Sequence, residues 1–145
     1  MAWKVRGLAP GSRLLIVLDS NQYINSLNKK VRLEEVFQIE DVSIRINELI
    51  IKEVLRNVSE QLKKEFYALL LRSDVVLRKE KLPMALFDKY RQKGLKKGDV
   101  VIASFCESEK AKYLVTENRH FLKEIKFDKF RVVKLDEFLA GTGRQ

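Results

Sequence analysis

The sequence predicts an α/β fold, a three-layer α/β/α sandwich with a central parallel sheet. Five consecutive apolar residues at positions 14–18, Leu-Leu-Ile-Val-Leu, are too few for a globular helix but suit a buried strand of such a sheet. Strand-like segments then alternate with helix-like ones, a pattern typical of parallel strands between helical layers. An apolar content of 46% and two prolines in 145 residues indicate a single folded domain, with its core over about residues 13–139.

The strands are predicted from short apolar or alternating segments. Residues 41–46, Asp-Val-Ser-Ile-Arg-Ile, alternate polar and apolar side chains, as a strand with two different faces does. In chain order, the predicted strands are 13–18, 41–46, 73–77, 112–116 and 130–135.

The helices are predicted from apolar spacing and from residues that favour helix ends. Asn47 and Ser59 are suitable N-caps, while Pro83 fits a helix start and Gly94 a helix end. The predicted helices are one or two across 23–38, then 48–58, 59–70, 83–94 and 98–109, with a turn or short helix at 136–139.

The charge of the chain predicts a polyanionic partner. Lysine and arginine number 29 against 20 acidic residues, a net charge of +9, which favours RNA or DNA as the partner class. Positive charge is densest over residues 89–97, although a basic run can equally be a solvated helix face.

Composition also bears on location. No apolar run approaches the roughly 20 residues of a membrane span, and residues 1–7 lack the apolar core of a signal peptide. Cys106 is the single cysteine and cannot form an internal disulfide, so we expect a small core residue in a cytoplasmic protein.

Three acidic residues occupy comparable places in the predicted fold. Asp19 ends the first strand, Glu53 lies in the helix after the second, and Asp99 begins the helix before the fourth. If the first and fourth strands are neighbours, these carboxylates meet at the carboxyl edge of the sheet, where α/β proteins bind ligands. Each acid also has a purely structural interpretation: Asp19 and Asp99 as helix N-caps, and Glu53 as a partner of Lys52 or Arg56.

Three clustered carboxylates would need a cation or shifted pKa values. Two unit charges about 4 Å apart repel by roughly 4 kcal/mol at an effective dielectric constant near 20. Oxygen ligands favour Mg²⁺ or Mn²⁺, and a chain with one histidine and one cysteine offers little to zinc. A magnesium or manganese ion within a basic surface suits phosphodiester hydrolysis.

The segments that carry these acids resemble the motifs of the PIN-domain nucleases, and the resemblance extends from about residue 13 to 139. The opening motif is similar to Val-Leu-Asp-Ser-Asn at 17–21, the second to Ile-Lys-Glu-Val-Leu-Arg-Asn at 51–57, and the third to Gly-Asp-Val-Val-Ile-Ala at 98–103. The fourth resembles Leu-Val-Thr-Glu-Asn-Arg-His-Phe at 114–121. Each motif is weak alone, but their order, their spacing and the basic charge make the combination fairly specific.

The resemblance implies a metal-dependent endoribonuclease directed at single-stranded RNA. It implies Asp19, Glu53 and Asp99 as metal ligands and activators of water, with Mg²⁺ or Mn²⁺ as the cofactor. Ser20, Asn21, Thr116 and Glu117 would support this site, and Lys93, Lys96, Lys97, Arg119 and His120 would contact RNA. Many relatives of this size are VapC-like toxins, so the resemblance also implies an antitoxin as a candidate partner and a homodimer.

The fourth motif departs from the family pattern. Family members often have aspartate where this chain has Asn118, and again where it has His120. The Asn118 amide oxygen could still ligate a metal weakly or bind a metal-bound water, but it brings no charge. Glu117 is next in sequence, yet neighbouring residues of an extended segment face opposite sides.

Two other functions compete with the nuclease. A PIN-like module that binds RNA without cleaving it is consistent with the missing fourth acid. A phospho-receiver domain could use Asp19 as its phosphate acceptor, but the basic charge is unusual for that class and the expected acidic pair after the first strand is absent.

Overall fold

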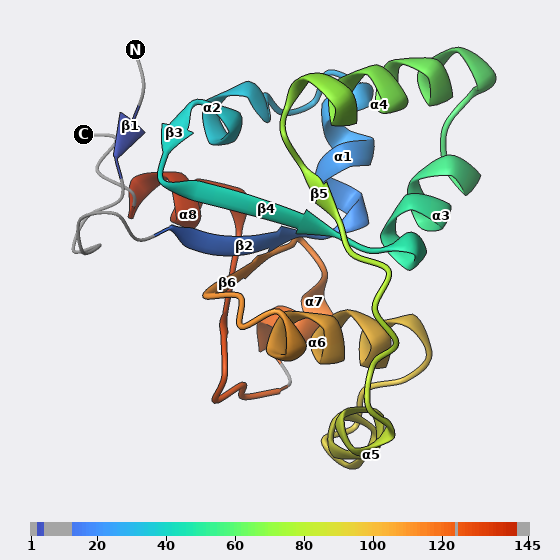
Figure 1. The fold of residues 1–145 in the computed structure, drawn as a ribbon, viewed down its shortest axis with the longest axis vertical. Helices are drawn as coiled ribbons and strands as arrows, with labels where there is room; N and C mark the ends of the chain where they lie inside the picture. The colour runs from blue at the N-terminus through green and yellow to red at the C-terminus, as the bar shows by residue number, and fades with distance from the viewer. Residues whose placement is uncertain (1–2, 5–12, 124, 142–145) are drawn as a thin grey trace.

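The computed structural model describes residues 3–4, 13–123 and 125–141. Of the residues 1–7 considered above for a signal sequence, all but 3–4 lie outside this range. The centre of the molecule is an all-parallel sheet with strand order β5-β4-β2-β6-β7 (Figure 1). The strands are β2 (Leu14–Leu18), β4 (Val42–Ile46), β5 (Val76–Leu77), β6 (Tyr113–Val115) and β7 (Arg131–Val133). With helices on both faces, the predicted α/β/α sandwich is confirmed.

β2 can occupy the centre of the sheet because it has apolar side chains on both of its faces. Ile16, Val17 and Leu18 are fully buried. β2 pairs in parallel with β4, Ile16 opposite Ile44, and with β6, Val17 opposite Leu114. The first and fourth predicted strands are therefore neighbours, which is the condition on which the convergence of the acids depends.

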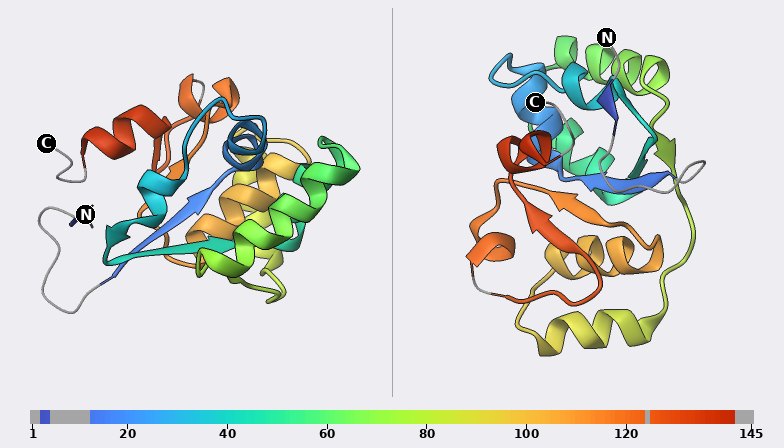
Figure 2. Two further views of the ribbon diagram at one scale, coloured as in Figure 1. Left: turned by 90° about the horizontal axis from the view of Figure 1, so that it is seen from above. Right: turned by 90° about the vertical axis from the view of Figure 1, so that its left-hand side faces the viewer.

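Helices cover both faces of the sheet (Figure 2). They are α1 (Ser20–Leu27), α2 (Glu34–Phe37), α3 (Glu48–Arg56), α4 (Glu60–Arg72), α5 (Met84–Gln92), α6 (Gly98–Ser108), α7 (Arg119–Lys123) and α8 (Leu135–Ala140). In Figure 1, α1, α2 and α4 lie above the sheet, whereas α5 and α6 lie below it. β4 runs left to right, and its carboxyl end leads into α3 on the right.

α6 shows how sequence determines position in this fold. Residues 102–106 of this helix, Ile-Ala-Ser-Phe-Cys, are all buried, so the helix is apolar around its circumference. Such a helix needs cover on both sides, and the sheet and α5 provide it (Figure 1). Cys106 is a fully buried member of this core, as predicted.

The predicted helix ends are largely confirmed. Asn47 and Ser59 accept hydrogen bonds from the amides of Ile50 and Leu62 and so cap α3 and α4. Pro83 precedes α5, and Gly94 follows it with a φ of 101° that favours glycine.

Several boundaries differ from prediction. α1 begins at Ser20 and not near residue 23, because Asp19 caps it. The strands expected at 73–77 and 130–135 are shorter, since the latter segment turns into α8 at Leu135. α7 and a two-residue parallel pair, β1 (Trp3–Lys4) with β3 (Ile39–Glu40), were not predicted.

Within residues 3–4, 13–123 and 125–141, every helix is too short or too polar to cross a membrane.

Candidate active site at the carboxyl edge of the sheet

Asp19 is held rigidly at the point where β2 ends. Its amide donates to the carbonyl of Val115 in the neighbouring strand at 3.0 Å. The carboxylate is 3% exposed; Oδ1 accepts from the Ser20 amide at 2.8 Å, and Oδ2 from the Thr116 hydroxyl at 2.7 Å. The predicted capping role of Asp19 is thus correct, and it places this carboxylate at the sheet edge as well.

Glu53 approaches the same edge from α3. A Cβ built on Gly98 would lie 3.6 Å from Glu53 Oε2 and 3.5 Å from Leu49 Cδ2, so α3 packs closely against the start of α6. Glu53 Oε1 is buried and has no hydrogen-bond partner among the described residues. A buried oxygen of this kind normally finds a partner, so it is a candidate position for a ligand.

Asp99 lies in the first turn of α6, one residue after Gly98. The N-cap of α6 is Lys97, so the structural interpretation of Asp99 as an N-cap is wrong. Asp99 is half-buried and free of the capping contacts that restrain Asp19.

The three carboxylates lie near enough to influence one another's pKa values. Burial is the first cause of a raised pKa for each of Asp19, Glu53 and Asp99. The negative charge of Asp19 raises the pKa of both Glu53 and Asp99, and the charge of Asp99 also raises that of Glu53.

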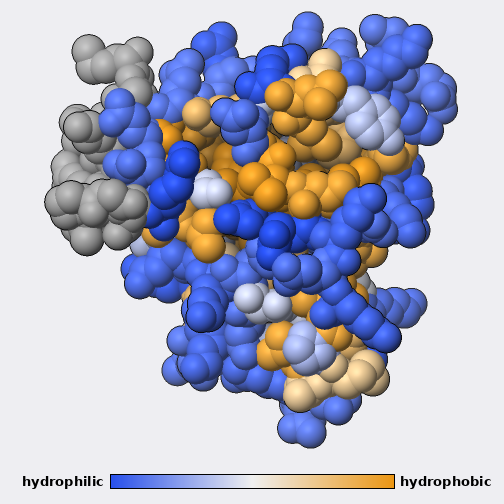
Figure 3. Space-filling model, in the orientation of Figure 1, coloured by the Kyte–Doolittle hydropathy of each residue, from blue (hydrophilic) through white to orange (hydrophobic). Residues whose placement is uncertain are grey.

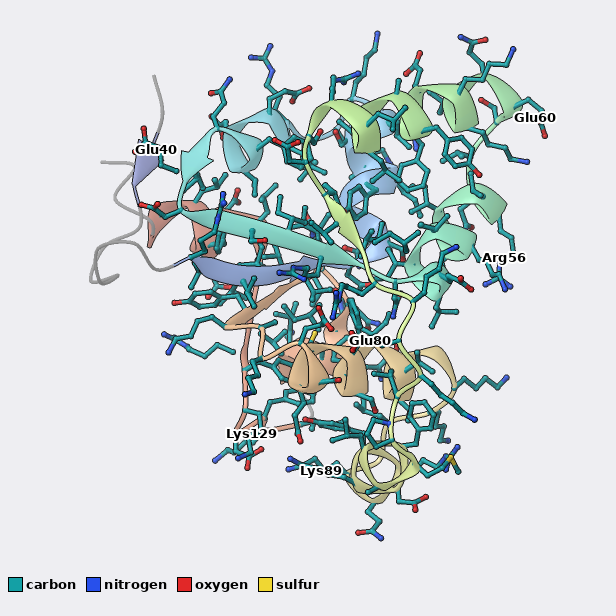
Figure 4. All side chains as sticks on the ribbon, viewed as in Figure 1. Glu40, Arg56, Glu60, Glu80, Lys89 and Lys129 are labelled. Atoms are coloured by element: carbon teal, nitrogen blue, oxygen red, sulfur yellow. The ribbon has the colours of Figure 1, made fainter. Side chains whose placement is uncertain are left out.

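Arg56, His120 and the Ser20 hydroxyl partly offset this repulsion. Arg56, which points outward at the end of α3 in Figure 4, lowers the pKa of Glu53, and His120 lowers that of Asp99. Hydrogen bonding to the Ser20 side chain lowers the pKa of Asp19 and of Glu53. Ser20 therefore acts on two of the acids, in agreement with its predicted supporting role.

Thr116 connects the fourth motif to the first. It is fully buried; besides donating to Asp19, its Oγ1 accepts from Asn21 Nδ2 at 3.1 Å and from the Asn118 amide at 3.0 Å. Asn21 Nδ2 also lies 3.4 Å from Asp19 Oδ2. Thr116 and Asn21 thus fix the Asp19 carboxylate from two sides.

Asn118 and Glu117 take structural positions. The Asn118 side-chain oxygen accepts a hydrogen bond from the His120 amide at 3.0 Å, at the start of α7. This is the oxygen that was predicted to bind a metal or a metal-bound water. Glu117 Oε2 accepts from Gln22 Nε2 at 2.9 Å and from the Leu135 amide at 3.3 Å. This carboxylate joins α1 to the start of α8.

Gln22 was missed by sequence analysis. It is 1% exposed, and Nε2 also donates to Asn21 Oδ1 at 3.1 Å, so it links Glu117 to the residues around Asp19. Glutamine is usually exposed, so its sequence position gives no sign of this role.

The basic residues divide into two groups. The residues assigned to RNA contact are all exposed: Lys93, Lys96, Lys97, Arg119 and His120. Lys96 and Lys97 immediately precede Gly98 and Asp99, and Arg119 and His120 begin α7. Lys89 instead binds Glu107 at 2.6 Å and Asp128 at 3.5 Å, which makes it a structural residue.

The donor set fits a hard cation that keeps part of its water shell. Among the residues described, no three histidine, cysteine, aspartate or glutamate side chains are arranged closely enough to hold a metal ion by themselves. Mg²⁺ usually binds through one or two carboxylates and retains several waters. The buried, unpartnered Glu53 Oε1 and the mutual repulsion of the acids are consistent with an ion held in that way.

Comparisons with known proteins leave the family open. No protein-family model matches the chain, and no curated protein matches it in sequence.

Proposed function

We propose that this protein is an Mg²⁺- or Mn²⁺-dependent endoribonuclease of the PIN-like type. The observation that carries the proposal is the meeting of Asp19, Glu53 and Asp99, from β2, α3 and α6, at the sheet edge with raised pKa values. A structural role alone would favour pairing these acids with cations, whereas the charges of Asp19 and Asp99 raise the pKa of Glu53.

The chain's residues suggest a division of labour. Asp19 is preorganised by Thr116 and Asn21, while Glu53 Oε1 and the less restrained Asp99 carboxylate are available to ligands. These three residues would hold the ion, and Lys96 and Lys97 would gather the RNA backbone. A bound Mg²⁺ or Mn²⁺ would polarise the scissile phosphate and lower the pKa of the attacking water.

Cleavage of a pool of structured and single-stranded RNAs tests the proposal. Wild type and Asp99→Asn, purified identically, are assayed with Mn²⁺ and with EDTA. We expect wild type alone to cut, and EDTA to abolish cutting. Equal cutting by both proteins would show that a contaminant or a different site is responsible, and the proposal would be withdrawn.

A second candidate is a PIN-like module that binds RNA without cleaving it. The specific observation in its favour is that Asn118 brings no charge and that its amide oxygen already begins α7. RNA binding without cleavage, at any metal concentration, would favour this function.

A Mn²⁺-dependent thermal shift separates the two candidates. Ligand binding to the native state at a hundredfold excess over Kd stabilises it by about 2.7 kcal/mol. For the nuclease we expect millimolar Mn²⁺ to raise the melting temperature of wild type, and Asp19→Asn to remove most of that rise. An unchanged melting temperature would count against an assembled metal site.

The toxin role, the antitoxin and the homodimer stay predictions of the family resemblance, since no described contact bears on them.

A further inference from the structure

A groove of about 290 Å³ includes Leu49, which lies with Glu53 against Gly98. It runs between the start of α3, one side of α6 and the segment that joins β5 to α5, and we call it the α3–α6 groove. Its apolar lining consists of Leu49, Leu82, Met84, Phe87, Val101 and Phe105. Figure 3 shows the corresponding apolar surface in the lower part of the molecule, bordered above by a hydrophilic band.

The groove adjoins the part of α3 that carries Glu53. Leu49 lines it and lies one helical turn, about 5.4 Å, before Glu53 on α3. Leu49 and Glu53 both lie against Gly98. On α6, Val101 and Phe105 follow Gly98 on the same side of the helix, so one wall of the groove continues from the residue beside Asp99.

The groove offers a hydrophobic surface that a planar ring could cover. Met84 is 63% exposed although it is apolar, and Phe87 is only partly buried. The Arg91 guanidinium lies 5.9 Å from the Phe87 ring centre, which steadies this ring and adds positive charge beside it.

Cations outnumber acids on the rim. Arg78, Lys79 and Lys81 line the groove together with Glu48 and Glu80, and Arg78 is paired with Glu80 and with Glu109. Figure 4 shows Glu80 on the segment between β5 and α5, in front of α6. Lys79 is 3.9 Å from Glu48 with both side chains largely exposed, and Lys81 pairs with no acid among the described residues. Lys81 is therefore available to an anionic ligand.

Asn47 supplies a hydrogen-bond donor. It lines the groove, is 7% exposed, and its Oδ1 is occupied by the Ile50 amide at 2.9 Å. Its Nδ2 donates to no other described residue, so the fixed amide presents an unused donor. Asparagine amides of this kind read acceptors on base edges.

We propose that the α3–α6 groove binds one unstacked nucleotide of single-stranded RNA, the nucleotide next to the scissile phosphate. Its base covers Phe87 and Met84, Asn47 contacts the base edge, and Lys81 and Lys79 hold the phosphate. This inference rests on the proposed function, because the acids define which phosphate is cut. Lys81 favours an anionic occupant over a neutral peptide, and the Phe87 ring and the Asn47 amide favour a nucleotide over an acidic peptide.

The test measures RNA binding in EDTA, so that it does not depend on catalysis. Fluorescently labelled single-stranded oligomers of A, C, G and U are titrated with wild type, Met84→Glu, Met84→Leu and the matched control Leu71→Glu. Leu71 is an exposed apolar residue of α4, 85% exposed, and does not line the groove. Both glutamate variants lower the net charge by the same amount, so an effect of net charge alone is the same in both.

We expect Met84→Glu to weaken binding at least about fivefold more than Leu71→Glu, and Met84→Leu to bind as wild type does. Ultraviolet cross-linking of a 4-thiouridine oligomer should label the peptide that contains residues 78–87. Equal weakening by the two glutamate variants, or no RNA binding by wild type, would overturn the proposal. Failure of the nuclease proposal is read separately, from cleavage that survives in Asp99→Asn.

Discussion

At the scale of single residues, Thr116 makes three hydrogen bonds in the site through one hydroxyl group. Its buried hydroxyl donates to Asp19 and accepts from Asn21 and from the Asn118 amide. A hydrogen bond to a charged group contributes about 1.5–3 kcal/mol, and its loss here leaves a buried carboxylate with one partner fewer. The hydroxyl therefore serves both the stability of the domain and the position of Asp19.

Thr116→Val keeps the shape of this side chain and removes the hydroxyl. We expect the free energy of unfolding in urea to fall by about 1.5–3 kcal/mol, and cleavage to fall with it. Thr116→Ser, which retains the hydroxyl, is the control and should lose far less. Equal stability of the valine and serine variants would contradict the assigned role.

Glu53 should destabilise the metal-free protein. Its pKa is raised above the ordinary value of 4.5, first by burial and then by the charge of Asp19. Since the folded pKa exceeds the unfolded one, the native state binds more protons than the unfolded state above pH 4.5, and stability falls as pH rises through the folded pKa.

Glu53→Gln removes this charge at nearly constant shape. In EDTA at pH 7 we expect a gain of at most about 1 kcal/mol, since Glu53 is only partly buried and solvent screens its repulsion. The melting temperature should also depend less on pH between 4.5 and 7 than in wild type. The exposed Glu65→Gln on α4 is the control, and a variant that melts below wild type at pH 7 would refute the interpretation.

At the scale of elements, the site depends on contacts between helices that are distant in sequence. The Glu117 carboxylate accepts hydrogen bonds from Gln22 of α1 and from the Leu135 amide at the start of α8. Gln22 also donates a hydrogen bond to Asn21. Removing this carboxylate would leave one N–H of the buried Gln22 amide without its acceptor, which costs about 1–3 kcal/mol.

Glu117→Ala is therefore expected to lower the free energy of unfolding by about 1–3 kcal/mol and to speed amide hydrogen exchange in α8. Glu117→Gln keeps an oxygen acceptor and should retain most of the stability. Unchanged exchange in α8 would show that Glu117 is not what fastens this helix.

The same comparison of elements shows what sequence could and could not predict. β2 was predictable from its apolar run, and α3 and α4 from apolar spacing and the caps Asn47 and Ser59. α7 was not, since a helix of five residues is too short to show the 3.6-residue period, and the two-residue strands β1 and β3 are too short to show alternation.

The site was predictable only in part for a similar reason. Asp19, Glu53 and Asp99 each follow from position relative to a strand, once β2 and β6 are taken as neighbours. The contact of Glu53 with Gly98 and the burial of Gln22 depend on how helices pack, and no pattern in the sequence records that packing. The hydrogen bond from the His120 amide to the Asn118 side-chain oxygen could not be predicted, because α7 itself was not predicted.

At the scale of the whole molecule, the net charge of +9 should make RNA binding depend strongly on salt. Neutralising Z phosphates of single-stranded RNA gives a slope of about −0.7Z in a plot of log K against log salt. For this salt dependence, the position of the cations matters more than their number. Only cations near the acids can contact the phosphates of an RNA strand that is bound there.

The triple variant Lys93→Gln, Lys96→Gln and Lys97→Gln tests this placement. If each side chain neutralises one phosphate, the salt slope should become shallower by about 2, and binding at low salt should weaken. A matched triple of Lys29→Gln, Lys30→Gln and Arg32→Gln removes equal charge beyond the far end of α1, and should change the slope little. Equal slopes for the two variants would mean that the RNA responds to net charge alone, and the assignment of residues 93–97 to the RNA path would be wrong.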